Sequence, residues 1–271
     1  PDAEGGSYRA VFETAKGLGI RGHRVILLTQ RIQSTDTQKD PREDPIAGIQ
    51  IFRYRVFQKP SALFFFTTWL AIIFHIFRIN RTMKIDVIYG HHLVPTFGFC
   101  LARFFFPKLH LVFNCYMLSH LQYEDEIRCR GRSRWMSQVP SYVLRWMERR
   151  VMKVSRRMIV YSQFVKGLLS DFENRVNDKV EVVFPGVDLE KFKLSSIYKK
   201  EYSIARRIQL LTVRRLESRM GLETLIEAVG MLRDRGIDFS LKIVGLGPME
   251  KSLCRRIVDL SLQKHVQLLG Y

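Results

Sequence analysis

Cysteine is scarce in this chain, and its few copies are scattered. Four cysteines occur, and no C-x-x-C pair is among them: Cys100, Cys115, Cys129 and Cys254. Neither a zinc knuckle nor a disulfide framework is therefore indicated. Free thiols without such a framework are typical of a reducing compartment, so we expect a cytosolic protein.

Acidic residues are also in short supply. The 271 residues include 44 Lys and Arg against 26 Asp and Glu, which gives a net charge of +18. This surplus favours a polyanionic partner or an anionic membrane surface. The sequence contains no RNA- or DNA-binding motif, so we do not expect nucleic acid as the partner. It begins at Pro1 rather than Met, so we expect the true N-terminus to lie upstream, and a signal peptide is not excluded.

Short apolar runs alternate with helix-like segments along the whole chain. The runs predict strands at 25–29, 49–56, 85–92, 109–115, 158–162, 180–183, 209–213, 239–244 and 266–269. Helical spacing is clearest from Leu222 to Leu232, and Gly236 closes that helix. A helix is also expected from Thr96 to Phe105. Strands and helices that alternate in this way predict parallel βαβ units.

Two turns in the C-terminal part are candidate ligand contacts. One is the basic turn from Arg214 to Gly221, and the other is Gly245-Leu246-Gly247-Pro248. Ligands bind at the carboxyl ends of strands in open α/β sheets, and phosphate groups gain from helix N-termini and bare backbone N–H groups. A Gly-x-Gly pattern alone is weak evidence.

The order and spacing of these turns resemble one family. Val213 to Leu216, Gly221 to Ala228 and Ile243 to Pro248 follow one another as in the nucleotide-sugar half of retaining GT-B glycosyltransferases of family 4. Further upstream, the strand Asp86-Val87-Ile88 leading to His91 is similar to a family segment. Pro185 to Phe192 is similar to the segment that precedes the family's interdomain linker.

The resemblance implies an α/β protein of the GT-B fold, with two Rossmann-like domains that contain parallel sheets. We expect an acceptor-side domain at residues 1–194 and the start of a nucleotide-sugar-binding domain at 195–271. The family's opening strand and its acidic donor-binding pair are expected outside these residues. The given chain is therefore interpreted as a fragment.

The resemblance also implies residues of the site. Gly5 and Gly6 are expected beside the donor phosphates; the two glycines alone would favour a simple turn, and the downstream match reverses that. His91 is expected at the ligand cleft as a catalytic residue. Tyr116 stands where the family has a catalytic histidine, and its phenol can still hydrogen-bond a sugar hydroxyl. His120 is an alternative to Tyr116.

On the donor side, Arg215, Gly245 and Gly247 match the family pattern. Met220 stands where the pattern has lysine, and methionine offers neither charge nor donor. Arg219 adjoins it and is a candidate for the missing cation.

The implied reaction is transfer of a sugar from a nucleoside-diphosphate sugar to a hydroxyl acceptor, with retention. The acceptor would be a lipid-linked saccharide or a polysaccharide precursor of the cell envelope. No cofactor or metal is expected, because Asp-x-Asp is absent and no cluster with ligand spacing lies near the implied cleft. Two alternatives stay open: a non-catalytic GT-B relative that binds a membrane or a partner, and another GT-B enzyme such as a nucleotide-sugar epimerase.

Two further segments concern membranes. Residues 62–77 are strongly apolar but shorter than a span of about 20 residues, so a buried or interfacial helix is expected. Residues 128–157 are rich in cations and tryptophan, and five residues at helical spacing predict a packed stripe: Val139, Val143, Met147, Val151 and Val154. We expect Arg145, Arg149, Lys153 and Trp146 to face an anionic membrane surface. The alternative is a solvated basic face. The expected location is cytoplasmic and peripheral, on the inner face of the membrane.

Overall fold

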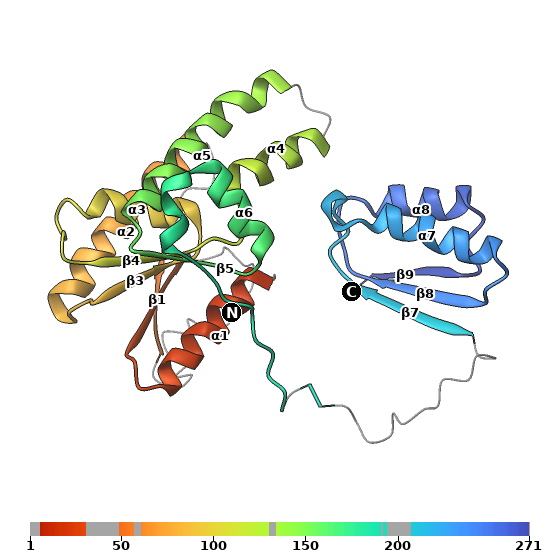
Figure 1. The fold of residues 1–271 in the computed structure, drawn as a ribbon, viewed down its shortest axis with the longest axis horizontal. Helices are drawn as coiled ribbons and strands as arrows, with labels where there is room; N and C mark the ends of the chain where they lie inside the picture. Colours follow the sequence, from red (N-terminus) through yellow and green to blue (C-terminus); the bar gives the residue numbers. More distant parts are fainter. Residues whose placement is uncertain are drawn as a thin grey trace. The chain divides into compact units, whose positions relative to one another are not determined.

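The computed structural model describes residues 6–30, 49–56, 61–129, 134–190, 192–193 and 207–270. The chain divides into two compact units, Pro1–Val187 and Asp188–Tyr271, each of which is described by itself (Figure 1). The predicted domain boundary after Leu194 falls outside the described residues and stays a prediction.

A two-stranded sheet opens the first unit. β1 (Val25–Gln30) lies parallel to β2 (Ile49–Tyr54), and α1 (Gly6–Ile20) packs beside both strands. The chain turns out of α1 at Gly22, whose φ of 86° is in the left-handed region that glycine adopts without strain.

A four-stranded parallel sheet forms the centre of the first unit. Its strands follow chain order: β3 (Val87–Gly90), β4 (His110–Asn114), β5 (Arg157–Val160) and β6 (Val180–Val182). α2 (Ser61–Thr82) precedes β3 in the chain. The segments between the four strands carry α3 (Leu93–Ala102), α4 (Ser119–Cys129), α5 (Arg134–Val154), α6 (Gln163–Phe172) and the 3-10 helix η1 (Asn174–Lys179). In Figure 1, α3 and α5 lie above this sheet, and α2 packs along α3. Alternate residues of β4 and β5, such as Leu111, Phe113, Met158 and Val160, fill the core beneath these helices.

α2 and α3 pack closely because Gly98 of α3, which has no side chain, faces α2. A Cβ on Gly98 would lie 3.1 Å from Cβ of Ile72, so a larger residue would push the helices apart. The indole of Trp69 donates to the backbone oxygen of Val94 at 3.2 Å. The predicted start of α3 at Thr96 is wrong, because the helix begins at Leu93. Pro95 fits its first turn, where a missing N–H removes no helical hydrogen bond.

The second unit is a three-stranded parallel sheet with its own core. Its strands are β7 (Ile208–Val213), β8 (Phe239–Val244) and β9 (Val266–Gly270), in that order. The 3-10 helix η3 (Ser218–Met220) precedes α7 (Leu222–Asp234), and α8 (Glu250–Asp259) follows β8. Leu222, Ile226 and Val229 of α7 pack on Leu241 and Ile243 of the sheet. The parallel sheets in both units confirm the predicted α/β class.

Candidate functional site

Four polar side chains meet at the carboxyl edge of the central sheet in the first unit. His91 follows β3, Asn114 ends β4, Tyr116 lies two residues later, and Tyr161 follows β5. The Nδ1 atom of His91 lies 3.0 Å from the Tyr116 hydroxyl, and Asn114 donates to the Tyr161 hydroxyl at 3.0 Å. His91 and Tyr116 are predicted from the sequence, and their catalytic role stays a prediction; Asn114 and Tyr161 were not predicted. Their only signal was that each stands at the carboxyl end of an expected strand.

The surroundings of this group keep its imidazole neutral at physiological pH. Burial, and then the neighbouring His92, lower the pKa of His91 from 6.5 to about 4. Burial, and then Tyr161, raise the pKa of the Tyr116 hydroxyl above its usual value. A neutral imidazole next to a protonated phenol can donate and accept hydrogen bonds, which is what a sugar hydroxyl requires.

The first turn of α1 reaches the same edge. The Tyr116 hydroxyl donates to the backbone oxygen of Ser7 at 3.3 Å, and the Tyr8 ring lies 5.5 Å from that of His92. Gly6 begins the helix, with open space where a Cβ would stand, and Gly5 lies outside the described residues. The structure therefore brings the start of α1 to Tyr116 and His92, and the predicted contact of the glycine-rich loop with donor phosphates stays a prediction.

A cavity of about 340 Å³ lies next to this edge. Its apolar walls include Leu28, Phe64 and Leu93, and its polar lining includes Tyr8, Tyr54 and Thr68. Thr68 is 2% exposed, and its hydroxyl has no hydrogen-bond partner in the described part of the chain. A cavity with apolar walls and a few polar groups is typical of a small-molecule site.

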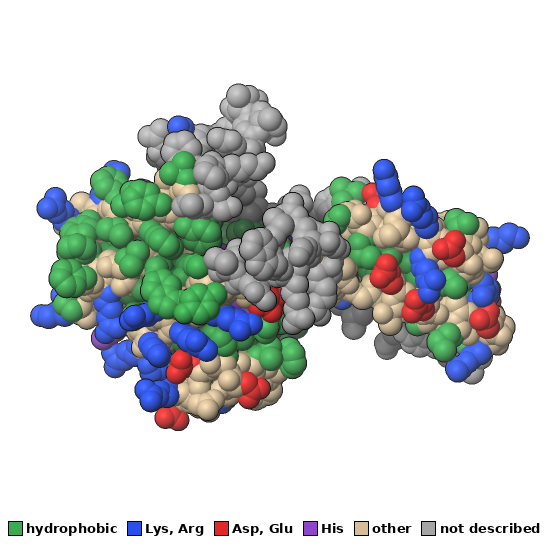
Figure 2. All heavy atoms as spheres, turned by 90° about the horizontal axis from the view of Figure 1, so that it is seen from above, with side chains coloured by type: hydrophobic (Ala, Val, Ile, Leu, Met, Phe, Trp, Pro, Cys, Tyr) green, Lys and Arg blue, Asp and Glu red, His purple; other side chains and the backbone are tan. Residues whose placement is uncertain are grey.

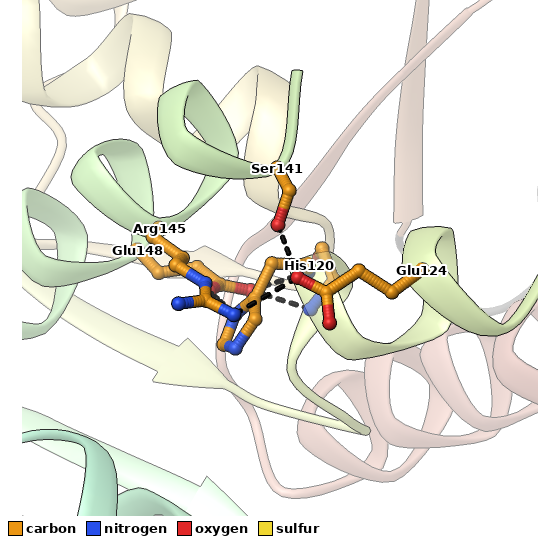
Figure 3. A network of polar contacts seen from close by, with 6 residues as sticks. His120, Glu124, Ser141, Arg145 and Glu148 are labelled. Carbon is orange, nitrogen blue, oxygen red and sulfur yellow. Dashed lines mark hydrogen bonds and ion pairs between the residues drawn. The ribbon is translucent and has the colours of Figure 1, made fainter. Parts of the chain in front are cut away.

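His120 does not join this group. It is 3% exposed, and its Nδ1 atom lies 2.5 Å from Oε2 of Glu148 on α5 (Figure 3). The backbone N–H groups of Ser119 and His120 donate to Oε1 of the same carboxylate, which caps the start of α4. His120 therefore fixes the loop after Tyr116 and does not replace Tyr116.

In the second unit, a carboxylate holds two arginines of the basic turn. Glu217 lies 3.3 Å from Nη1 of Arg215 and 3.0 Å from Nε of Arg219. Arg215 is largely exposed, and the turn leads into α7 at Gly221, which has no side chain to cap the helix. Two guanidinium groups at an uncapped helix N-terminus form a suitable environment for an anion.

The two predicted glycines of the second turn lie against the basic turn. A Cβ on Gly245 would stand 1.8 Å from the backbone oxygen of Arg214, and one on Gly247 would stand 2.4 Å from that of Leu216. The Leu216 N–H donates to Leu246 at 3.0 Å, which joins the two turns directly. These glycines therefore allow the close approach of the turns, and their contact with a donor stays a prediction.

Met220 and Arg214 have different surroundings. Met220 is partly buried and packs against the core of the second unit. Its side chain therefore has a packing role at the position where the family pattern has lysine. Arg214 is exposed, and its backbone N–H donates to Val244.

The basic residues predicted for a membrane surface lie on α5, and each has a partner inside the first unit. Arg145 pairs with Glu124, Lys153 with Glu173, and Arg149 lies over the Phe172 ring. The ring of Trp146 lies 5.1 Å from that of Phe97 and is partly exposed. The predicted packed stripe is only partly correct. Met147 and Val151 are buried, whereas Val143 is exposed and the side chain of Val139 lies outside the described residues.

Two α/β units with parallel sheets, each with polar groups at the carboxyl edge, define a GT-B architecture. The structure of HepE from Anabaena in complex with UDP has a TM-score of 0.64 at 17% identity, covering 100% of this chain and 67% of HepE. Sucrose-phosphate synthase from Thermosynechococcus elongatus has a TM-score of 0.68 at 15% identity, covering 98% of this chain and 65% of the synthase.

Family profiles match almost the whole sequence. Residues 4–191 match Glycosyltransferase Family 4, and residues 196–271 match Glycosyl transferases group 1. The chain therefore belongs to the family 4, group 1 glycosyltransferases.

Two curated relatives differ in how much they share with this chain. The amylovoran biosynthesis glycosyltransferase AmsK of Erwinia amylovora is 33% identical over 94 residues, which are 35% of this chain and 22% of AmsK. An uncharacterized glycosyltransferase of Methanocaldococcus jannaschii, MJ1607, is 24% identical over 268 residues, which are 95% of this chain and 63% of MJ1607. The chain thus spans less than two thirds of the length of either relative.

Proposed function

We propose that this protein transfers a sugar from a nucleoside-diphosphate sugar to a hydroxyl acceptor, with retention at the anomeric carbon. The observation that carries the proposal is the pair of arginines, Arg215 and Arg219, held by Glu217 at the uncapped start of α7. The similar HepE has been crystallised with UDP and with UDP-glucose, which supports a uridine nucleotide sugar as the donor.

The donor diphosphate is assigned to the basic turn because its charge grows during transfer. When the bond to the sugar breaks, negative charge develops on the leaving diphosphate. Guanidinium groups and helix N–H groups that are already in place stabilise this charge without reorganising. Arg215 is the principal contact in this proposal, and Arg219 is its neighbour.

The acceptor is assigned to the first unit. The cavity beside His91 and Tyr116 combines apolar walls with hydroxyl groups, as an amphipathic acceptor such as a lipid-linked saccharide requires. Neutral His91 and protonated Tyr116 would orient sugar hydroxyls at its edge. The name of AmsK, an amylovoran biosynthesis enzyme, supports a polysaccharide precursor as the product.

Calorimetric titration of UDP and UDP-glucose into the full-length protein tests the donor assignment. Arg215→Ala should weaken binding by at least about tenfold, because it removes a charge-assisted hydrogen bond. Arg255→Ala removes another exposed charge, from α8, and should leave the affinity unchanged. An unchanged affinity in Arg215→Ala would exclude this turn as the donor site.

A second candidate function is a non-catalytic relative that binds a membrane or a partner protein. The packing of Met220 against the core favours it, because the family pattern has a lysine at this position. In that case UDP-glucose would not be turned over by the full-length protein with any lipid-linked acceptor tested.

The proposed location is cytoplasmic and peripheral to an anionic membrane. The net charge of +18 supports this, as do the exposed cations of α5 next to partly exposed Trp146.

A further inference from the structure

One side of α2 exposes large apolar residues along its length. Leu63, Phe66, Leu70 and Phe74 are all exposed, and Phe74 is 62% exposed. They are three or four residues apart, so they lie on the same side of the helix. The opposite side is buried against the core through Ile72, Ile76 and Ile79.

The apolar side continues beyond α3. Leu101, Phe104 and Phe105 are exposed, and Phe104 is 87% exposed. The ring of Phe77 on α2 lies 5.4 Å from that of Phe105, which connects the two segments. Figure 2 shows hydrophobic side chains gathered on this side of the first unit, with Lys and Arg side chains around them. We call the exposed residues of α2 together with Leu101, Phe104 and Phe105 the apolar face.

The charges that accompany the apolar face are cationic. α2 ends with exposed Arg78 and Arg81, and exposed Arg103 and Lys108 flank the phenylalanines after α3. Between residues 61 and 109 the sequence has one acidic residue, Asp86.

α5 also exposes aromatic and cationic residues. They include Tyr142 and Trp146 together with Arg145, Arg149 and Arg150, and the single acidic residue of α5, Glu148, is 2% exposed. The ring of Phe97 on α3 lies 5.2 Å from Trp69 of α2 and 5.1 Å from Trp146, so α2, α3 and α5 share one aromatic layer.

We propose that the apolar face inserts into one leaflet of an anionic membrane, with α2 lying in the plane of the interface. Phenyl and leucyl side chains would enter the acyl boundary, and the arginines beside them would contact lipid phosphates. Charge complementarity selects an anionic bilayer as the occupant. This proposal extends the peripheral location of the proposed function and assigns it to α2 rather than to α5 alone.

A transmembrane orientation of α2 conflicts with its packing. Leu63–Thr82 is long and apolar enough to cross a membrane, and no other described helix is. However, crossing would remove Ile72 from Gly98 and Trp69 from Val94, and so would break the packing of α2 on α3. An interfacial helix keeps both contacts and still buries the exposed side.

The same helix borders the cavity of the first unit. Phe64 and Thr68 of α2 line it, one turn or less from exposed Leu63 and Phe66. If the cavity takes a lipid-linked acceptor, as the proposed function states, insertion of α2 would bring that cavity to the lipid in which the acceptor resides.

Vesicle flotation of the full-length protein tests the insertion. Phe66→Glu and Phe74→Glu, each made singly, should lower partitioning onto phosphatidylglycerol-containing vesicles by at least about tenfold, because each places a charge where a phenyl would be buried. Phe164→Glu is the matched control: it adds the same charge at a 68% exposed phenylalanine of α6 and should change little. Unchanged melting temperature and unchanged UDP affinity in all three variants separate lost insertion from lost folding or lost donor binding.

Depth is measured with tryptophan at the same positions. Phe74→Trp should add fluorescence that brominated lipids quench, whereas Phe164→Trp should not. Equal flotation of Phe74→Glu and Phe164→Glu would overturn the proposal, as would wild-type protein that ignores anionic vesicles. A lipid-free dimer that Phe74→Glu dissociates would instead make a second copy of the chain the occupant.

Discussion

The carboxylate of Glu217 forms ion pairs with two arginines of the basic turn. These pairs affect how strongly the turn binds an anion. Arg215 and Arg219 both contact this carboxylate, so part of their positive charge is already offset before a diphosphate binds. This offset limits the net gain from each guanidinium. An additional cation without an ion-pair partner would strengthen diphosphate binding more. Residue 220 adjoins Arg219 and is the place for such a cation.

Met220→Lys should therefore tighten binding of nucleoside diphosphates by about tenfold to a hundredfold, the effect of one charge-assisted hydrogen bond. The alkyl stem of lysine can occupy the space in which Met220 packs, while its ammonium group reaches the start of α7. Calorimetric titration of UDP into the wild type and the variant measures the effect. A lower melting temperature without tighter binding would show that Met220 has only a packing role.

His91 links the stability of the first unit to pH. Its pKa is about 4 in the folded protein against 6.5 in an unfolded chain, so the unfolded state binds more protons between these values. The free energy of unfolding should therefore fall as pH drops from about 6.5 toward 4, and this effect should be absent above 6.5. His75 and His92 also have lowered pKa values and contribute in the same direction.

His91→Asn isolates the share of His91. The advantage of the wild type over the variant in melting temperature should shrink between about pH 7.5 and about pH 5, because only the wild type must protonate a buried imidazole at this position on unfolding. Parallel melting curves at both pH values would contradict the assigned pKa.

At the scale of elements, the turns after β7 and β8 are packed backbone against backbone. Gly245 has a φ of 145°, and a Cβ there would overlap the backbone of Arg214. Gly245→Ala should destabilise the protein by about 3 kcal/mol or more, through strain and backbone displacement together.

Gly236→Ala provides the control for Gly245→Ala. Gly236 also has a positive φ, of 70°, but a Cβ there would meet nothing within 4 Å, so only about 1 kcal/mol of strain is expected. Urea denaturation of the two variants compares the costs, and equal losses would show that the close approach of the two turns is not needed.

Most elements could be predicted from the sequence, because apolar runs mark buried strands directly. The run at 239–244 is β8 to the residue, and the run at 25–29 is β1 less its final glutamine. The start of α3 could not be predicted, since Pro95 is compatible with both a boundary and a first turn. The burial of individual residues of α5 could not be predicted either. Periodicity shows which residues share a helical face, but it does not show which element packs against that face. Val143 lies on the predicted stripe and is exposed.

The candidate site was predictable only where the chain itself brings residues together. His91 and Tyr116 follow neighbouring parallel strands, so their approach follows from strand order. Thr68 lies in the middle of an apolar helix, and nothing in its sequence neighbours indicates that it borders a cavity. Glu148 is one charged residue among many on α5, and only the fold makes it the cap of α4.

The whole molecule is expected to work without a divalent cation. The described residues hold no group of three or more His, Cys, Asp or Glu that could bind a metal, while the basic turn supplies positive charge from arginine. Sugar transfer by the full-length protein should therefore survive EDTA at the rate of the untreated enzyme. Activity that EDTA abolishes and Mg²⁺ or Mn²⁺ restores would contradict the assignment of arginines to the leaving diphosphate.

Every strand pairing in the described part of the chain joins a strand to the next one in the sequence, from β1 with β2 to β8 with β9. During synthesis, each of these strands can therefore pair with the strand made just before or just after it. As the ribosome releases the chain from its N-terminus, each new βα segment can dock on the sheet edge left by the one before, and the exposed edge moves along with synthesis. Loop-closure entropy grows only slowly with loop length, so the longest crossover, from β4 to β5, costs little more than the shorter one from β5 to β6. The second unit has its own core and its own consecutively paired strands, so it can fold after the first.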